Sequence, residues 1–260
     1  QENSILWQDL VKISSSPGGK RPKAIVALNK GTGEVISGQG IIPEGFQHYI
    51  LKYDDNSAYP YAKLEYVYYR MALDAGIEMM PSELRTYDGV THFLTQRFDR
   101  EGNEKIHTQT LAAMLPTSDS YEDIFSVIRR LNLPYEDSRQ HFLRMVFNVT
   151  TRNVDDHSKN FSFCMNKKGI WRLSPAYDLT YSVDLTAPAY SNRHSLTING
   201  KNEDITREDL GTVGQNNDIQ DYNALIDTVY NAVAKFESHA RELRIDEKLI
   251  KSIQEDFIKV

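Results

Sequence analysis

Hydrophobic and polar positions alternate with a two-residue period over much of the first third of the chain, a pattern typical of β-strands. Residues 23–29 are an apolar run, residues 34–37 follow a Gly-Thr-Gly turn, and residues 48–53 alternate between the two classes. The period changes to that of a helix over residues 58–75, where the apolar side chains fall on one face. Gly76 follows that predicted helix as a stop signal.

Helical periods dominate the rest of the chain, with two hairpins among them. The elements predicted there are, in order, a hairpin over 84–98 turned at Asp88-Gly89, helices over 123–133 and 137–152, a hairpin of 161–165 with 170–173, and helices over 221–236 and 246–257. The pattern predicts one α+β domain over residues 1–260, with a strand-rich lobe over 1–100 and a helical lobe over 101–260. Ligands tend to bind where two such lobes meet, so we expect the site there.

Composition and charge exclude several classes of protein. Apolar residues make up 40% of the 260 residues and charged residues 25%, as in an ordinary globular protein rather than a collagen-like or disordered one. The 30 basic and 36 acidic residues give a net charge of −6, which argues against direct nucleic-acid binding. Cys164 is the only cysteine, so no internal disulfide can form, and no apolar run reaches the roughly 18 residues of a membrane span. We expect a cytoplasmic protein that does not bind membranes.

The strongest chemical signal follows the helix predicted over 137–152. Asp155 precedes Asn160 by five residues, which is the spacing of a kinase catalytic loop, and Asp178 follows 23 residues after Asp155. In such a loop the Asp orients or deprotonates the acceptor hydroxyl, while the Asn and the second Asp hold Mg²⁺ on the nucleotide phosphates. Phosphoryl transfer needs this combination of a carboxylate at the nucleophile and hard oxygen ligands for the metal.

The same residues have other interpretations. An Asp or Asn at such positions commonly caps a helix or a turn. His157 with Asp155 or Asp156 could hold the metal ion of a phosphohydrolase, although such a site needs further ligands at defined spacing. The ordered set, with a helix before it and a hairpin between its parts, favours the kinase interpretation.

The strand-rich part of the chain offers a cation for the phosphates. Lys52 lies within an apolar strand, where it would contact phosphates or, alternatively, protect an edge strand from aggregation. Glu65, early in the next helix, could pair with Lys52 as the helix Glu of a kinase pairs with its strand Lys. On its own, Glu65 would be a solvated helix residue.

Two further segments have the composition of nucleotide contacts. Residues 14–23 are small, flexible and basic, so Gly18 and Gly19 would let backbone amides approach phosphates while Lys23 adds charge. A disordered terminus explains this segment equally well. Residues 96–100 end the second strand of the predicted hairpin, where their backbone groups would meet an adenine or simply end the strand.

Several motifs together resemble those of HipA-type serine/threonine kinases, the toxins of bacterial toxin–antitoxin pairs. They are residues 95–100, 107–112, 154–162 and 174–179, and the resemblance runs across most of the chain. A His two residues after the catalytic Asp is typical of this family and of lipid-kinase-like relatives. The resemblance implies a two-lobed protein-kinase-like α+β fold, with a strand-rich N-lobe and a helical C-lobe.

The resemblance also implies roles for individual residues. Asp155 would be the catalytic base, His157 and Lys159 would complete the catalytic loop, and Asn160 and Asp178 would hold Mg²⁺. The residues implied at the nucleotide are Gly18, Gly19, Lys23, Lys52, Gln96, Arg97, Phe98, His157, Lys159, Asn160, Tyr177 and Asp178.

The implied function is an ATP- and Mg²⁺-dependent kinase that phosphorylates a translation protein, such as an aminoacyl-tRNA synthetase, and also itself. Ser16, or its neighbours Ser14 and Ser15, would be an inhibitory autophosphorylation site, because a phosphate there would repel the phosphates of ATP. The implied partner is a DNA-binding, HipB-like antitoxin. The alternative is a catalytically silent protein that keeps the fold, binds an antitoxin and takes part in transcriptional repression through it.

Two features depart from the family pattern. Gln96 stands where an acidic hinge residue is expected, which affects one side-chain contact. The full-length family also has an amino-terminal subdomain ahead of the phosphate loop, so we expect that this part was removed or is a separate protein.

Overall fold

The structure is a computed structural model that describes residues 22–54, 59–184, 188 and 192–259. Contacts within the chain divide it into two compact units, one of residues 1–66 and 80–106 and the other of residues 67–79 and 107–260. The first unit contains the larger sheet and the second unit contains most of the helices, so the predicted α+β class is confirmed. The single-domain organisation stays a prediction.

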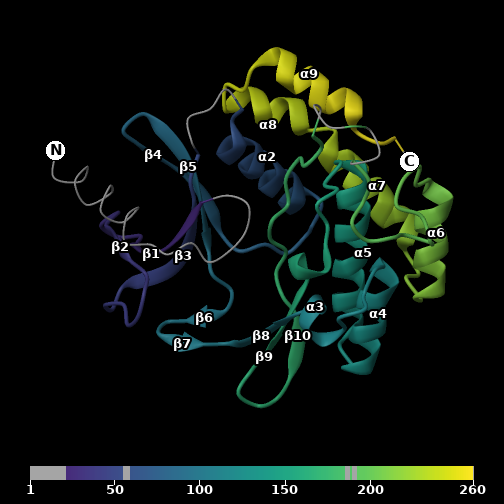
Figure 1. Ribbon diagram of the computed structural model, residues 1–260, viewed down its shortest axis with the longest axis horizontal. Coiled ribbons are helices and arrows are strands. Elements are labelled where there is room, and N and C mark those ends of the chain that lie inside the picture. Colours follow the sequence, from purple (N-terminus) through teal and green to yellow (C-terminus); the bar gives the residue numbers. More distant parts are fainter. Residues whose placement is uncertain (1–21, 55–58, 185–187, 189–191, 260) are drawn as a thin grey trace. The chain divides into compact units, whose positions relative to one another are not determined.

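A five-stranded antiparallel sheet forms the first unit, in the order β2-β1-β3-β5-β4 (Figure 1). Its strands are β1 (Lys23–Asn29), β2 (Val35–Ser37), β3 (Phe46–Lys52), β4 (Ser82–Tyr87) and β5 (Val90–Gln96). The β4–β5 turn is Asp88-Gly89, where both residues have positive φ angles of 49° and 81°, as a tight hairpin turn requires. The predicted hairpin is therefore confirmed, although β5 ends at Gln96 rather than Phe98.

The two faces of this sheet differ in character. One face carries a buried apolar cluster, which consists of Ala24, Val26, Leu28, Tyr49, Leu51 and Leu94. Because side chains alternate along a strand, Lys23 and Lys52 lie on the opposite face, where the β1–β3 register makes them direct cross-strand partners. Helix α2 (Tyr61–Asp74) begins just after Pro60, and its Glu65 forms an ion pair with Lys52. A two-stranded ribbon of β6 (Arg100–Glu101) and β7 (Glu104–Lys105) completes the described strands of this unit.

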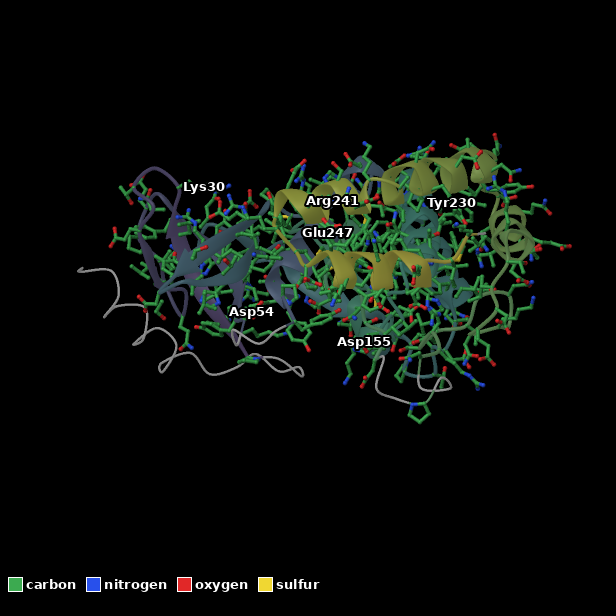
Figure 2. All side chains as sticks on the ribbon, turned by 90° about the horizontal axis from the view of Figure 1, so that it is seen from above. Lys30, Asp54, Asp155, Tyr230, Arg241 and Glu247 are labelled. Carbon is green, nitrogen blue, oxygen red and sulfur yellow. The ribbon has the colours of Figure 1, made fainter. Side chains whose placement is uncertain are left out.

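Helix α5 (Tyr135–Thr150) is the centre of the second unit, and every residue from Gln140 to Thr150 is buried. It packs against α4 (Tyr121–Arg130) and α7 (Tyr222–Val233) (Figure 1). Helices α8 (Phe236–Glu242) and α9 (Glu247–Asp256) are joined by Arg241, whose guanidinium donates to Glu247 at 2.9 and 3.0 Å (Figure 2). None of the helices in the described part of the chain is long and apolar enough to cross a membrane.

A three-stranded sheet in the second unit contains the predicted short hairpin. The hairpin is β9 (Ser162–Met165) and β10 (Trp171–Leu173), and β8 (His107–Thr110) pairs with β9 on its other side. The short helix α3 (Leu111–Met114) follows β8 directly. Sequence reasoning missed β8 because its residues, His-Thr-Gln-Thr, show no alternation of apolar and polar side chains.

Helix α6 (Arg207–Asn216) is also absent from the sequence prediction, since Gly211 and Gly214 interrupt its pattern. Close packing explains the second glycine, because a Cβ at Gly214 would lie 2.8 Å from Cβ of Tyr222. The sequence does contain one signal for the start of α6, the capping box of Thr206 and Asp209. In it, each side chain accepts a hydrogen bond from the backbone amide of the other residue.

His141 makes the stability of the second unit dependent on pH. Its ring is fully buried beside Tyr121, Phe125 and Phe161, and its Nε2 hydrogen-bonds to the Tyr121 carbonyl at 3.0 Å. Burial lowers the pKa of His141 from 6.5 to about 3. The unfolded chain therefore binds a proton that the folded chain excludes. We expect the free energy of unfolding to decrease as the pH falls below 6.5, by up to about 1.4 kcal/mol per pH unit from this group.

Urea unfolding between about pH 7 and pH 5 measures this dependence, above the range in which most carboxyl groups titrate. In His141→Gln the titrating ring is gone, while an amide donor remains for the Tyr121 carbonyl. We expect the variant to lose part of the slope seen in the wild type. Equal slopes in the two proteins would show that His141 is not the group responsible.

Candidate active site

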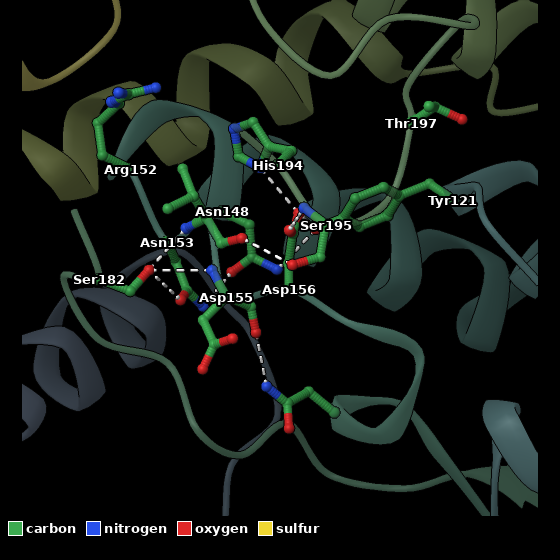
Figure 3. Close-up of polar contacts among 12 residues, drawn as sticks. Tyr121, Asn148, Arg152, Asn153, Asp155, Asp156, Ser182, His194, Ser195 and Thr197 are labelled. Carbon is green, nitrogen blue, oxygen red and sulfur yellow. Dashed lines mark hydrogen bonds and ion pairs between the residues drawn. The ribbon is translucent and has the colours of Figure 1, made fainter. Parts of the chain in front are cut away.

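The candidate catalytic loop, residues 153–160, begins where α5 ends. Arg152 has a positive φ of 58°, which turns the chain away from the helix. Asn153 fastens the loop to α5, since its Nδ2 donates to Oδ1 of Asn148 at 3.0 Å. Asn148 in turn donates to the Tyr121 hydroxyl at 2.9 Å (Figure 3). The loop ends in the short 3-10 turn η1 (Ser158–Asn160), and the chain then enters β9.

Asp156 anchors this loop in the interior of the second unit. Its side chain is completely buried. One oxygen accepts hydrogen bonds from the Tyr121 hydroxyl at 2.7 Å and from Nδ1 of His194 at 2.8 Å, and the other accepts from the backbone amide of Ser195 at 2.7 Å (Figure 3). Hydrogen bonds to a carboxylate are stronger than those between neutral groups, so these three donors, two of them on the buried side chains of Tyr121 and His194, hold the loop firmly at this point.

This anchoring removes Asp156 from the metal-site interpretation. Both of its oxygens already accept hydrogen bonds from other residues of the second unit. In the described part of the chain, no three His, Cys, Asp or Glu residues gather in a way that could hold a metal ion. Asp156 is therefore a structural carboxylate.

Asp155, the adjacent residue, is directed outward (Figure 2). Its side chain is 70% exposed, and its carboxylate lies 3.9 Å from Nε2 of His157. Its backbone carbonyl accepts a hydrogen bond from Nδ2 of Asn160 at 2.8 Å. An accessible carboxylate on a fixed backbone is what a catalytic base or an orienting group requires.

Asn160 and Asp178 line one pocket of the second unit, together with Asn148, Arg144 and Tyr177. Asp178 has a positive φ of 54°, a backbone region that residues other than glycine adopt uncommonly and that is frequent at functional sites. Its carbonyl accepts a hydrogen bond from Nδ2 of Asn153 at 3.4 Å. The fold thus brings the two predicted metal ligands to the same pocket, although they lie in separate segments of the sequence.

The oxygen atoms that Asn160 and Asp178 bring to this pocket are suitable ligands for Mg²⁺. Carboxylate and amide oxygens are hard ligands, which Mg²⁺ prefers and usually shares with water and phosphate oxygens. Because Asn160 uses Nδ2 for the Asp155 carbonyl, Oδ1 is the atom that it can offer to a metal. Asp178 would supply the negative charge.

Tyr177 and Lys159 are joined to each other within the site. The Tyr177 hydroxyl donates to the Lys159 carbonyl at 2.8 Å and lies 2.5 Å from Oγ of Ser162. Burial raises the pKa of Tyr177 well above its usual value, so the hydroxyl keeps its proton and remains a donor. This contact ties the segment that carries Asp178 to the end of the catalytic loop.

Arg144 is a site residue that sequence reasoning missed. It projects from α5 into the same pocket and is only 3% exposed. Burial lowers the pKa of its guanidinium to about 10, so the group remains charged at neutral pH. Within the described residues its Nε has no hydrogen-bond partner. No sequence signal distinguishes this arginine, since only the packing of α5 shows which side of the helix faces the pocket.

The first unit contains the predicted Lys52–Glu65 ion pair. Both side chains are largely buried, with 16% and 12% exposure, so Glu65 is not a solvated helix residue. Lys52 lies on β3, which has a strand on either side, so its interpretation as a protector of an edge strand is wrong. Lys23 faces Lys52 across the β1–β3 pair, and two like charges in direct opposition favour a negative partner there.

The predicted hinge segment already uses several of its polar groups. The backbone amide of Gln96 donates to the Pro81 carbonyl at 3.0 Å, and that of Arg97 donates to the His48 carbonyl at 2.9 Å. The Arg97 guanidinium donates to both oxygens of Asp99, at 2.8 and 2.7 Å. Burial alone would raise the pKa of Asp99, but these hydrogen bonds hold it below its usual value. An adenine at this segment would therefore have to contact other groups than these.

Five of the predicted site residues, Ser14, Ser15, Ser16, Gly18 and Gly19, lie outside the described residues. Their roles at the phosphates and in regulation stay predictions.

Comparison with solved structures places this fold among the kinases. One similar structure is a chain of the Shewanella oneidensis MR-1 toxin–antitoxin complex of HipA, HipB and operator DNA. The match spans 93% of this chain and 63% of the Shewanella chain, with a TM-score of 0.68 and 16% identity. A second similar structure is the Helicobacter pylori proinflammatory kinase CtkA. That match spans 80% of this chain and 84% of the CtkA chain, with a TM-score of 0.56 and 12% identity. The protein thus has a protein-kinase-like α+β fold, as the sequence predicts.

The family is equally clear. The family described as HipA-like C-terminal domain matches residues 15–257, and the chain belongs to it. A Sinorhizobium fredii (strain NBRC 101917 / NGR234) protein named "Putative kinase Y4mE" is 28% identical over 130 residues, which cover 44% of this chain and 31% of the relative. The chain spans less than two thirds of the length of this relative and of the Shewanella chain. The predicted resemblance to HipA-type kinases is confirmed.

Proposed function

We propose that the protein is an ATP- and Mg²⁺-dependent serine/threonine kinase and the toxin of a toxin–antitoxin pair. The observation that carries this proposal is in the helical unit, where the exposed Asp155 carboxylate stands on a loop closed by Asn160 and Asn160 shares a pocket with Asp178. A carboxylate for the acceptor hydroxyl and two hard oxygen ligands are the set that phosphoryl transfer needs. Family membership and the kinase-like fold support the same chemistry.

Each residue would have a distinct task. Asp155 would orient the acceptor hydroxyl or take its proton, with His157 beside it. Asn160 and Asp178 would hold Mg²⁺, which would neutralise charge on the phosphate oxygens. Lys52, held by Glu65, would add a positive charge at the phosphates.

We also propose the partners by relation to the family. The Shewanella relative was solved with HipB and operator DNA, which supports a DNA-binding antitoxin as the partner of this protein. The phosphate acceptor of the protein described here would be a protein of the translation apparatus, such as an aminoacyl-tRNA synthetase. Autophosphorylation would fall on residues 14–16. The net charge of −6 supports contact with DNA through the antitoxin rather than directly.

Incubation with labelled ATP, with and without Mg²⁺, tests the kinase activity. We expect label from the γ-phosphate on the protein or on an added aminoacyl-tRNA synthetase, only when Mg²⁺ is present. Release of phosphate without any protein labelling would instead favour a hydrolase. Binding of ATP with neither reaction would favour the silent antitoxin-binding protein.

Replacement of Asp178 tests the metal site. Asn tolerates a positive φ, so Asp178→Asn removes the charge and keeps the backbone. At an ATP concentration about 100 times its Kd, binding stabilises a protein by about 2.7 kcal/mol. We expect most of the Mg²⁺-dependent part of this stabilisation to be lost in the variant, as measured by thermal unfolding with and without Mg²⁺.

The matched control for this measurement is Asp204→Asn. Asp204 is exposed and also has a positive φ, of 51°, but lies in a surface turn. The Asp204→Asn substitution should leave the Mg²⁺-dependent stabilisation by ATP unchanged. Full Mg²⁺-dependent stabilisation in Asp178→Asn would exclude Asp178 as a metal ligand.

A further inference from the structure

Ser182 bonds two successive backbone amides of the catalytic loop. Its Oγ accepts hydrogen bonds from the amide of Val154 at 2.7 Å and from that of Asp155 at 3.0 Å (Figure 3). These amides belong to an irregular segment that has no helix or strand neighbour to satisfy them. A backbone amide is a strong hydrogen-bond donor, and here one hydroxyl accepts from two of them.

The third hydrogen bond of this hydroxyl connects it to Asp178. A serine hydroxyl has one proton to donate and two acceptor positions. The proton goes to Oδ1 of Asn153 at 3.3 Å, so all three positions are used. Nδ2 of the same Asn153 donates to the Asp178 carbonyl at 3.4 Å. Ser182 and Asn153 therefore join the segment after Asp178 to the segment before Asp155.

The segment that carries Ser182 is itself held in place. The Ser182 amide donates to the Arg152 carbonyl at 3.4 Å. The hydroxyl of the buried Tyr181 donates to Asp256 at 3.1 Å, and Arg152 donates to the same Asp256 oxygen at 3.2 Å. Ser182 thus presents its hydroxyl from a fixed support.

Both backbone polar groups of Asp155 are held by side chains. Ser182 accepts from its amide, and Asn160 donates to its carbonyl. The carboxylate between them is exposed. With the peptide groups on both sides of Asp155 fixed, the direction in which its side chain leaves the backbone is fixed as well.

We propose that Ser182 is a positioning residue that directs the Asp155 carboxylate toward the acceptor hydroxyl. This proposal rests on the proposed kinase function. It assigns Ser182 to the turnover step rather than to nucleotide binding, because its contacts are with the backbone of Asp155. Loss of the hydroxyl would release the amides of Val154 and Asp155, while the bond from Asn153 to the Asp178 carbonyl does not involve this hydroxyl.

Two measurements on Ser182→Ala separate the contact from its effect on catalysis. Hydrogen exchange followed by NMR at the amides of Val154 and Asp155 reports the contact and needs no activity. We expect exchange to become roughly tenfold faster or more, since both amides lose their acceptor. In the transfer assay we expect kcat to fall roughly 10- to 100-fold, with KM for ATP within about twofold, because a small misplacement of a catalytic group is costly.

Three further variants make the test specific. Ser182→Thr keeps the hydroxyl and should restore kcat to within about threefold of the wild type. Ser195→Ala removes another hydroxyl that contacts this loop, one that donates to the Val154 carbonyl at 3.0 Å, and should change kcat by less than about twofold. If Ser182→Ala does not fold, Ser182→Cys replaces it, since a thiol is a much weaker hydrogen-bonding group.

Each outcome decides the proposal. Faster exchange with an unchanged kcat, an equal loss in Ser195→Ala, or a Thr variant as poor as Ala would overturn it. Unchanged exchange would show that Ser182 does not hold the loop. Absence of transfer in the wild type with every acceptor would overturn the proposed function instead, and the exchange result would still decide whether Ser182 supports the loop.

Discussion

Phosphoryl transfer is expected to fall by about 10²- to 10⁴-fold in Asp155→Asn, the range that removal of a general base typically causes. The substitution replaces one carboxylate oxygen by an amide group of the same size, and the side chain is mostly exposed, so the fold should not change. The backbone contacts of Asp155 with Ser182 and Asn160 do not involve the carboxylate and should remain. ATP binding should therefore stay close to that of the wild type.

Mass spectrometry of the phosphorylated product measures the transfer, and calorimetric titration measures ATP binding. Asp88→Asn is the matched control, because Asp88 is exposed and lies in a hairpin turn that accepts Asn. It makes the same change in charge and should leave both quantities unchanged. Normal transfer by Asp155→Asn would exclude Asp155 as the base, and a combined loss of transfer and ATP binding would indicate a structural role.

The largest effect on stability is expected from the neighbouring residue. Asp156→Ala removes a buried carboxylate and leaves three donors without their partner, those of Tyr121, His194 and the Ser195 amide. Breaking a buried charged contact by removing one partner typically costs about 3–5 kcal/mol. We expect a loss of this size in the free energy of unfolding, measured by urea unfolding followed by circular dichroism.

An Asp that caps a helix at the surface provides the comparison. Asp246 accepts hydrogen bonds from the amides of Lys248 and Leu249 at the start of α9. Loss of such a cap in Asp246→Ala should cost about 0.5–2 kcal/mol. If Asp156→Ala cost no more than Asp246→Ala, the buried network would contribute little beyond an ordinary cap.

The sequence is informative about the proposed catalytic residues because their chemistry depends on local spacing. Asp155 and Asn160 lie in one loop, and the five-residue interval alone indicates their relation. The pairing of Lys52 with Glu65 could also be predicted from the sequence, since a strand and the helix that follows it bring the two residues together. The hairpin turned at Asp88-Gly89 had an equally local signal.

The supports of the loop could not be predicted in this way. Asp156 and His194 are 38 residues apart in sequence, and no pattern in either segment indicates the other. The sequence predicts a cap or a metal ligand at Asp156 because, without its partners, an Asp beside Asp155 looks the same in all these roles. No sequence signal marks Ser182, for the same reason. Gly214 interrupts the helical pattern of α6, and only its packing against Tyr222 explains why a glycine stands there.

The order of these supports along the chain has a consequence for biosynthesis. The candidate catalytic loop, residues 153–160, leaves the ribosome before Ser182, His194, Ser195 and Asp256, which hold it or its support in place. A nascent chain that already carries Asp155 and Asn160 therefore lacks the contacts that fix them. Because domains generally fold as units during synthesis, the loop should reach its final geometry only after α9 has emerged. A prematurely terminated chain would contain the residues of the candidate catalytic loop without the ordered geometry of that loop.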